Sequence, residues 1–295
     1  MKQNIVVVLV AFMLIFSTAA KQGKYYTING VWSGGDNEMV YLQKKDGKTK
    51  EVTRFDSAKV VAGKFVIEGK KSLPIDEYEL STAYGKSSFV LSENPVVATV
   101  TTNVIMGKRG EVKRASIVFS GDVEQHFYGE CNKAKMTGAV GVMGVAFMLP
   151  KAQEEGNKQL EDSLIQIYVS SQAAQKRIQD SLMDNFTDSY AIALLVRDIS
   201  SKTEPFDKFE RRYNALSDRV KKSSIGLELK AMVAMIGKAA VGNIAPDFKA
   251  NTPEGKALSL SSLKGKYVLI DFWASWCSPC LAEVPNVKAV YDEYN

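Results

Sequence analysis

The C-terminal stretch Asp271–Asn295, DFWASWCSPCLAEVPNVKAVYDEYN, determines how this part of the chain is interpreted. It holds two cysteines with two residues between them, Cys277 and Cys280, and continues as a segment with helical character. The preceding run Tyr267–Trp273 is almost continuously apolar, which is typical of a strand buried on both faces of a parallel sheet. The stretch therefore predicts a strand, a dithiol and a helix in direct succession.

The spacing of the two cysteines predicts thiol–disulfide exchange. At the start of a helix, the sulfur of Cys277 lies near free backbone N–H groups and the positive end of the helix dipole, and both favour the thiolate. Cys280 follows three residues later on the same helical face, close enough to form a disulfide and to resolve a mixed intermediate. Pro279 suits the first helical turn, where its missing N–H needs no partner. We therefore expect Cys277 to be the nucleophile and Cys280 the resolving thiol.

Two carboxylates are candidates for the proton transfer that this chemistry requires. Asp271 interrupts the apolar run, and a buried carboxylate is costly unless it has a role. Glu283 lies three residues after Cys280, about one turn along the same face. The alternative role for Glu283 is a first-turn acid that interacts favourably with the helix dipole. Trp276 and Pro279, next to the cysteines, are candidate substrate-binding residues.

The N-terminus has the three-part layout of a secretory signal. Lys2 is followed by the apolar run Ile5–Phe16 and then by the small residues Ser17–Ala20. The alternative is a membrane anchor, but the apolar run is too short to span a bilayer. We expect a signal peptide over residues 1–20, export to the periplasm or cell envelope, and no stable membrane span after cleavage.

Composition narrows the remaining classes of function. The net charge is +5, but basic and acidic residues are interleaved and no run of five like charges suggests a nucleic-acid tail. Three cysteines in an exported chain do not make a disulfide scaffold, and Cys131 is expected to be a small buried residue. His126, the sole histidine, could supply with Cys131 only half of a four-ligand zinc site. We expect no metal and no cofactor.

Patterning predicts an α+β multidomain chain of about two domains or more. Residues 21–120 contain many short alternating runs with Gly, Asn and Asp between them, which predicts an accessory antiparallel β domain resembling a sandwich. Residues 121–242 switch to helical periodicity. Within them, Met136–Leu149 carries no charge and predicts a buried helix or packed loop, with a partner-facing surface as the alternative. Residues 243–295 form the third part.

The sequences APDF (Ala245–Phe248) and LSSLKGKYVLIDFWASWCSPCLAEVP (Leu260–Pro285) resemble the thioredoxin-like oxidoreductases of the bacterial envelope, including the cytochrome-maturation type, within the redoxin superfamily. The resemblance implies a thioredoxin fold, disulfide exchange with partner proteins, and an upstream membrane electron donor. It matches Cys277 and Cys280 to the family's nucleophile and resolving cysteine. It also matches Asp271 to a buried aspartate, and the motif residues Glu283 and Pro285 to the family's CxxCxxExP pattern.

The resemblance covers part of a fold. Family members continue beyond this helix into further strands and helices, including a loop with a cis-proline that holds substrate. Residues 243–295 correspond to about the N-terminal half, so we expect an incomplete or shortened family member. The β region more loosely resembles the accessory domain often fused to such proteins. Two alternatives stay open, namely a non-enzymatic envelope binding protein with a relic tail and, less favoured by the motif, a thiol peroxidase.

Overall fold

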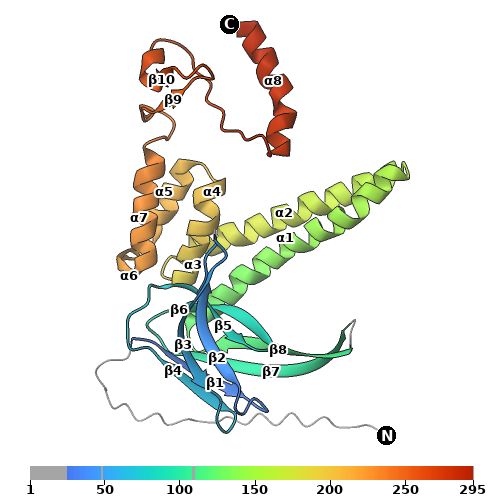
Figure 1. Ribbon diagram of the computed structural model, residues 1–295, viewed down its shortest axis with the longest axis vertical. Helices are drawn as coiled ribbons and strands as arrows, with labels where there is room; N and C mark the ends of the chain where they lie inside the picture. Colours follow the sequence, from blue (N-terminus) through green and yellow to red (C-terminus); the bar gives the residue numbers. More distant parts are fainter. Residues whose placement is uncertain (1–24, 48, 108–109, 295) are drawn as a thin grey trace. The chain divides into compact units, whose positions relative to one another are not determined.

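The computed structural model describes residues 25–47, 49–107 and 110–294. The predicted signal peptide, residues 1–20, lies outside the described residues. The chain divides into two units, one ending at Gly237 and one running from Lys238. Helices and strands both occur, and the strands form several sheets, as Figure 1 shows. The prediction of a mixed α+β chain is confirmed at this level.

Two four-stranded sheets make up the β part of the first unit (Figure 1). Their strands are β1 (Thr27–Trp32), β2 (Met39–Lys45), β3 (Val52–Lys59), β4 (Lys64–Glu68), β5 (Asp76–Thr82), β6 (Gly85–Leu91), β7 (Val96–Gly107) and β8 (Gly110–Ser120). One sheet has the order β4-β1-β7-β8 and the other β3-β2-β5-β6. All pairs are antiparallel except β1 with β7, where Ile28 is opposite Val96. This parallel pair needs a long crossover, and the other sheet lies within that connection.

The two sheets share one hydrophobic core, because alternate residues of each strand point to the same side. In β4, Phe65 and Ile67 are buried while the residues between and beside them are exposed. The Phe65 ring occupies the space next to Gly30 of β1, where a Cβ would come within 1.9 Å of it. Trp32 is buried and donates its indole N–H to the hydroxyl of Thr102 at 2.8 Å. The sheets therefore pack on residues that the alternating sequence pattern identifies.

The helical part of the first unit has its own core. It consists of α1 (Val123–Glu154), α2 (Lys158–Asn185), α3 (Tyr190–Leu195), the π-turn η1 (Val196–Ser200), α4 (Ser201–Thr203), α5 (Phe206–Ala215), α6 (Asp218–Lys222) and α7 (Ser224–Gly237). The side chain of Asp122 caps α1 by accepting from the N–H of Gln125 at 3.0 Å. Apolar residues at helical spacing run from Phe206 to Val220, and they are divided between α5 and α6 because Ser217 caps a new helix.

Charged groups join the β part to the helical part. Arg197 of η1 pairs with Asp76 of β5 at 3.1 Å. The carboxylate of Glu124, fully buried in α1, accepts from the Ser189 hydroxyl at 2.7 Å and the Ala191 N–H at 3.1 Å. A buried carboxylate is tolerated where donors surround it. The Arg197–Asp76 pair connects η1 to β5, and the hydrogen bonds to Glu124 hold the start of α3 against the start of α1.

The uncharged segment Met136–Leu149 was predicted to be a buried helix or a packed loop. It is helical, but most of its large apolar side chains are not buried. Gly138 and Gly141 face α2, where an added Cβ would come within 1.6 Å of Gln175 and 1.9 Å of Ser171. The glycines allow the two helices to approach closely, whereas most large apolar side chains of the segment point elsewhere and are exposed. The predicted burial of Met136–Leu149 was too high, because the apolar residues of this segment lie on all sides of the helix.

The second unit contains little regular structure before its last helix. It has the hairpin β9 (Lys249–Asn251) with β10 (Ala257–Ser259), the 3₁₀ turn η2 (Leu260–Leu263), and α8 (Ser278–Tyr294). The carboxylate of Asp247 accepts from both the N–H and the hydroxyl of Ser261 at 2.8 Å, and these bonds lower the pKa of Asp247. These two bonds join Asp247, which precedes β9, to Ser261 of η2, which follows β10.

The strand predicted over Tyr267–Trp273 is not formed. Tyr267 and Phe272 are exposed, at 109% and 87%, and no described residue pairs with this backbone as a strand. A strand needs a ladder partner for its N–H and C=O groups, and an apolar composition does not supply one. Among the described residues, no helix has the length and apolar character needed to cross a lipid bilayer.

Candidate redox site

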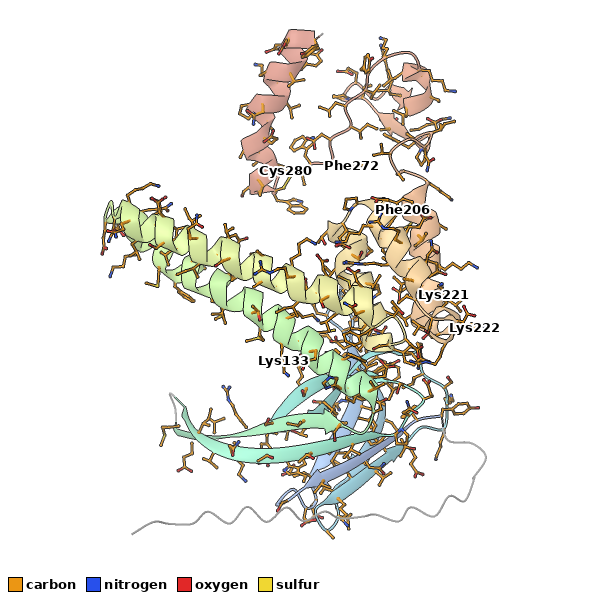
Figure 2. The ribbon with its side chains drawn as sticks, turned by 180° about the vertical axis from the view of Figure 1, so that it is seen from behind. Lys133, Phe206, Lys221, Lys222, Phe272 and Cys280 are labelled. Carbon is orange, nitrogen blue, oxygen red and sulfur yellow. A yellow bond between two sulfur atoms is a disulfide. The ribbon has the colours of Figure 1, made fainter. Side chains whose placement is uncertain are left out.

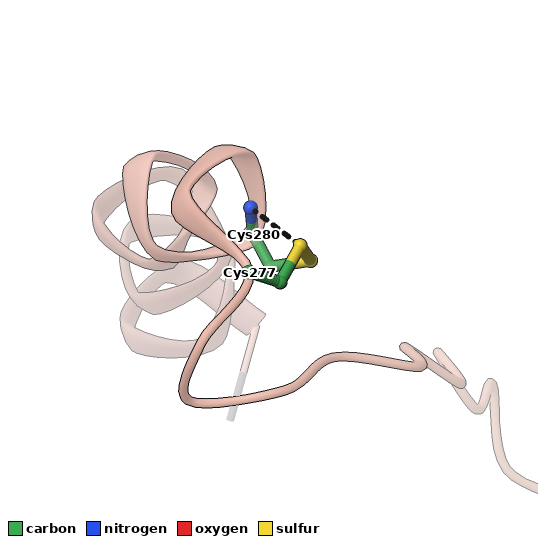
Figure 3. The surroundings of a disulfide bond; sticks show 2 residues. All are labelled: Cys277 and Cys280. Atoms are coloured by element: carbon green, nitrogen blue, oxygen red, sulfur yellow. Dashed lines mark hydrogen bonds between the residues drawn. A yellow bond between two sulfur atoms is a disulfide. The ribbon is translucent and has the colours of Figure 1, made fainter.

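The two cysteines of the motif form a disulfide. Cys277 and Cys280 are bonded, with their Cα atoms 5.3 Å apart, as Figure 3 shows. Cys277 is the last residue before α8, and Cys280 lies in the first turn of that helix. The spacing of three residues brings the sulfurs together because one helical turn separates them. The predicted pairing of these side chains is thus present in the structure.

Cys277 occupies the N-cap position of α8. Its carbonyl accepts from the N–H of Leu281 at 3.0 Å, which is the first bond of the helix. Its sulfur accepts from the N–H of Cys280 at 3.3 Å, shown by the dashed line in Figure 3. An N-cap side chain accepts from the second or third helical N–H, and the second residue here is Pro279, which has none. The Cys280 N–H therefore has the Cys277 sulfur as its capping acceptor.

Both cysteines are partly accessible. Their side chains are neither buried nor fully exposed, whereas Trp276 is 86% exposed and Pro279 is exposed. A turn before the helix holds the first cysteine, because the N–H of Cys277 donates to the Ala274 carbonyl at 3.0 Å. A partner that approached the disulfide would find Trp276 and Pro279 beside it in the sequence and open to contact.

The two predicted proton-transfer residues are not assembled around the sulfurs. Asp271 is exposed, so the expectation of a buried aspartate is wrong for this structure. Its burial would require the strand over Tyr267–Trp273, which is not formed. Glu283 is also exposed and lies in the second turn of α8, not in the first. Neither carboxylate makes a hydrogen bond or ion pair with another described residue. Their roles stay predictions.

The third cysteine belongs to a different environment. Cys131 is free and 3% exposed within the helical core, which confirms the expectation of a buried residue. Burial raises the pKa of its thiol to about 11. His126 is exposed and meets the edge of the Phe127 ring. Within the described ranges, no group of three or more His, Cys, Asp or Glu residues could hold a metal ion.

Sequence reasoning did not identify two contacts that shape this unit. One is the double hydrogen bond from Ser261 to Asp247, and the other is the turn that joins Ala274 to Cys277. The acidic residue of APDF and the serine-rich stretch near Ser261 were the available signals for the first contact. The second involves backbone atoms alone, so no side-chain pattern could have predicted it.

Two family models match the chain. The AhpC/TSA family matches residues 241–295, and a domain of unknown function, DUF4369, matches residues 26–139. The first match contains the disulfide and α8. The second covers the two sheets and the first part of α1. The region of the two sheets is thus similar to a family whose description names no activity.

Known relatives match the same C-terminal stretch. The thioredoxin-like protein YneN of Bacillus subtilis is 47% identical over 53 residues, which is 18% of this chain and 31% of the relative. The thiol–disulfide oxidoreductases ResA of Bacillus thuringiensis and Bacillus anthracis are each 42% identical over 57 residues, or 19% of this chain and 33% of the relative. The chain thus spans about a third of the length of the curated relatives it matches. No solved structure is significantly similar to the chain.

Proposed function

Because residues 241–295 belong to the redoxin superfamily, we propose that the protein is an exported thiol–disulfide oxidoreductase acting through Cys277 and Cys280. The observation that carries this proposal is the disulfide at the N-cap of α8. The site combines a reversible two-electron bond, partial exposure and a backbone donor aimed at the first sulfur. The relatives named as thiol–disulfide oxidoreductases match this stretch and support the same class of reaction.

The exchange follows from the positions of the two sulfurs. In the reduced protein, the Cys277 thiolate attacks a sulfur of a partner disulfide, and the partner's other sulfur leaves as a thiolate. Cys280 then attacks the Cys277 sulfur, the mixed disulfide breaks, and the second partner thiol is released. The partner gains two electrons and the Cys277–Cys280 bond forms. The reverse sequence oxidises a partner dithiol.

The helix start favours Cys277 as the attacking atom. The Cys280 N–H, which donates to the Cys277 sulfur at 3.3 Å, would stabilise a negative charge there. The aligned peptide units of α8 act in the same direction. Cys280 lies inside the first turn, so its sulfur gains less from these donors. Nucleophile and resolving thiol are assigned on this basis.

The residues around the disulfide have proposed roles in proton transfer and in contact with the partner protein. Asp271 and Glu283 serve as proton acceptor or donor for the resolving thiol, in an arrangement of the segment closer to the sulfurs. Trp276 and Pro279 contact the partner protein, since both are exposed next to the disulfide. Pro279 also keeps the second helical position free of a competing N–H.

We place this reaction in the periplasm or cell envelope. The apolar run Ile5–Phe16 and the small residues Ser17–Ala20 support export, and an oxidising compartment suits a working disulfide. Partners are envelope proteins with thiols or disulfides, cytochrome-maturation substrates among them, and a membrane electron donor regenerates the dithiol. Residues 243–295 supply the dithiol part of a thioredoxin-like fold, and the sandwich-like β domain serves as an accessory module.

Trapping of the mixed disulfide tests the proposed reaction. The Cys280→Ser variant lacks the resolving thiol, so reaction with a small protein disulfide such as that of insulin should leave a covalent adduct on Cys277. The Cys277→Ser variant is the matched control and should give no adduct. Mass spectrometry of the adduct before and after dithiothreitol identifies the bond.

The opposite distribution would contradict the assignment. Adducts of equal yield in both variants would show that the helix start does not distinguish the sulfurs. Absence of any adduct in the Cys280→Ser variant, with the reduced thiol confirmed by alkylation, would contradict thiol–disulfide exchange by this dithiol.

A further inference from the structure

The ribbon formed by β7 and β8 extends beyond the rest of its sheet. Figures 1 and 2 show its two strands projecting from the other strands. β1 pairs with β7 only from Val96 to Val100, whereas β8 pairs with β7 as far as Gly107. On the other edge, the N–H of Ala115 in β8 donates to the Tyr84 carbonyl at 2.9 Å. Beyond these positions, no strand in the described part of the chain pairs with either edge of the ribbon.

The projecting part of the ribbon is exposed to solvent on both of its faces. Residues Asn103–Met106 and Gly110–Arg114 are all exposed. Four of them are apolar, with exposed fractions of 38–77%: Val104, Ile105, Met106 and Val112. We call these four residues, together with Lys113 and Arg114, the β7–β8 tip. Grouped apolar side chains that are left in water mark a candidate interaction surface.

Positive charge is concentrated in this part of the sequence. The stretch Asn103–Arg114, NVIMGKRGEVKR, has four basic residues and one acidic residue, Glu111. Its net charge is therefore +3, compared with +5 for the whole chain of 295 residues. Lys113 lies over the Tyr84 ring at 5.6 Å, and neither Lys113 nor Arg114 pairs with a carboxylate of a described residue. An anionic surface is the electrostatic complement of these free charges.

The apolar and basic residues of the tip are arranged in order along the ribbon. Val104 is opposite Lys113 and Asn103 is opposite Arg114, while Met106 lies nearer to the turn. At about 3.3 Å per residue, the two basic residues follow the level of Met106 by roughly 7–10 Å. Elements that bind at a membrane surface insert their apolar side chains by about 5–10 Å. The basic side chains are therefore at the level of the lipid headgroups when the apolar end reaches the acyl chains.

We propose that the β7–β8 tip binds the surface of a membrane that contains anionic lipids. The apolar side chains enter the boundary between headgroups and acyl chains, and Lys113 and Arg114 contact the lipid phosphates. The unpaired N–H and C=O groups along the ribbon edges prevent deeper insertion, because such groups are costly in hydrocarbon. At headgroup depth, water and phosphate oxygens supply their partners.

Other occupants fit the tip less well. Unpaired strand edges of two copies can pair with each other, but each copy would bring the same basic residues, and like charges that face each other across strands are destabilising. A soluble polyanion would contact the basic residues and leave the apolar ones exposed. An anionic lipid surface uses both kinds of side chain.

A matched pair of double substitutions tests the role of charge. Lys113→Gln with Arg114→Gln removes two charges from the tip. Lys70→Gln with Lys71→Gln removes two exposed charges next to Gly69, which bonds to Tyr26 at the far end of the sheet. Flotation with vesicles of phosphatidylglycerol and phosphatidylcholine measures the affinity. The protein used begins at Lys21, the form that the proposed cleavage leaves, so the apolar run before it does not contribute.

The two double variants should differ strongly in affinity. The change at the tip should weaken binding by about 20- to 30-fold, since each basic residue near an anionic surface contributes about fivefold. The change at the far end should weaken it by less than about twofold, because salt screens charges beyond about 10 Å. Vesicles of phosphatidylcholine alone should bind the unchanged protein much more weakly.

Site-specific fluorescence tests which part of the ribbon enters the lipid. In the oxidised protein Cys277 and Cys280 are bonded and Cys131 is buried, so a newly introduced cysteine is the reactive thiol. Met106→Cys and Val118→Cys are each labelled with a nitrobenzoxadiazole fluorophore. Val118 is 63% exposed and lies more than about 20 Å along the ribbon from the level of Met106. Vesicles should shift the emission of the Met106 label to shorter wavelength and leave the Val118 label unchanged.

The acidic residue beside the tip provides a test of opposite sign. Glu111 is opposite Met106, where its carboxylate repels anionic headgroups. Glu111→Gln should therefore strengthen binding by about fivefold. Raising the salt concentration from about 0.05 to 0.5 M should weaken binding and reduce this difference. Circular dichroism melting of every variant verifies that the fold is unchanged.

Four outcomes would overturn the proposal. The first is no binding to the phosphatidylglycerol vesicles, and the second is an equal effect of the two double substitutions. The third is an unshifted emission from the Met106 label in vesicle-bound protein, which would indicate contact through charge alone. The fourth is a lipid-free dimer in sedimentation that the Lys113 and Arg114 substitutions strengthen, which would assign the tip to a second copy of the chain.

Discussion

The first four residues of strand β2, Met39–Leu42, and the segment Tyr267–Trp273 are both rich in apolar residues, yet they have opposite environments. In β2, Val40 and Leu42 are completely buried between the neighbouring strands β3 and β5 and the facing sheet. The side chains of Tyr267–Trp273 are exposed and its backbone has no strand partner among the described residues. The difference shows that apolar composition marks the capacity to form a buried strand. Whether such a strand forms depends on a neighbouring strand that pairs with its backbone and on other elements that cover its side chains.

The largest expected effect comes from one substitution made in both regions. Phe89 is completely buried and stacks on Phe119 with ring centroids 4.6 Å apart, whereas Phe272 is 87% exposed. Phe89→Ala should lower the free energy of unfolding of the first unit by about 3–5 kcal/mol, through lost burial and the cavity left behind. Phe272→Ala, in the second unit, should change the free energy of unfolding of the chain by less than about 0.5 kcal/mol. Urea unfolding followed by circular dichroism measures both.

Similar losses for the two phenylalanine variants would contradict this comparison. A large loss from Phe272→Ala would mean that its ring is packed in solution. The strand missing over Tyr267–Trp273 would then be formed under those conditions.

The sequence predicted most of the β part because its strands alternate. The short alternating runs predicted between residues 21 and 120 correspond to a stretch in which the structure has β1 to β8, since the period of two fixes which residues face the shared core. The uncharged stretch of α1 was predicted less well. Its apolar residues surround the helix, and the sequence does not say that α2 covers the glycine side alone.

A second comparison uses two adjacent arginines. Arg212 is buried and donates to Glu204 at 2.5 Å, Asp180 at 2.7 Å and Asp184 at 2.9 Å, while Arg211 is exposed and pairs with one carboxylate. Arg212→Ala removes the buried guanidinium that pairs with Glu204, whose side chain is 5% exposed, and should cost about 3 kcal/mol. Arg211→Ala should cost less than about 0.5 kcal/mol. Thermal melts of both variants distinguish them, and equal shifts would remove the distinction between buried and exposed pairs.

The same network predicts an acid-sensitive first unit. Burial opposes ionisation of Asp180, but hydrogen bonds from Arg212, Lys176 and Lys208 outweigh it and lower its pKa. The pKa of Glu204 is lowered against burial in the same way. A carboxyl with a lowered folded-state pKa contributes stability above its unfolded pKa of about 4, and this is lost as the pH falls toward the folded value.

The free energy of unfolding should therefore fall by roughly 2 kcal/mol between about pH 5 and pH 2. Asp180→Asn should show a shallower decrease over this interval, because one of the linked carboxyls is absent. Urea titrations at fixed pH values measure the slope. Equal slopes for the two proteins would mean that Asp180 is not linked to folding.

The smallest effect distinguishes two glycines of α1. A Cβ on Gly141 would lie 2.6 Å from Cβ of Ser171 in α2, whereas nothing lies within 4 Å at Gly144. Gly141→Ala should destabilise the hairpin by about 1–2 kcal/mol through overpacking. Gly144→Ala should stabilise it by up to about 1 kcal/mol, because alanine favours the helix. Hydrogen exchange of the hairpin amides reports both signs, and stabilisation by both would refute the close approach at Gly141.

The candidate site was predictable where it depends on neighbours in the sequence. The Cys277–Cys280 bond and the helix start follow from a spacing of three residues. Asp271 was predicted to be buried from the strand around it, and that property depends on pairing with other strands. Local spacing thus accounts for the correct prediction of the disulfide, and the missing strand partners account for the incorrect prediction of a buried Asp271.

The most direct test of the proposed chemistry compares the two thiol environments in one protein. After reduction, Cys277 at the start of α8 should react with iodoacetamide at neutral pH, and Cys131, whose pKa is raised to about 11 by burial, should react far more slowly. Peptide mapping after short pulses from pH 5 to pH 9 gives the rate for each cysteine. The account predicts that Cys277 reaches half of its maximal rate at a lower pH than Cys280, with Cys131 protected throughout. Equal pH profiles for Cys277 and Cys280, or faster reaction of Cys131, would contradict it.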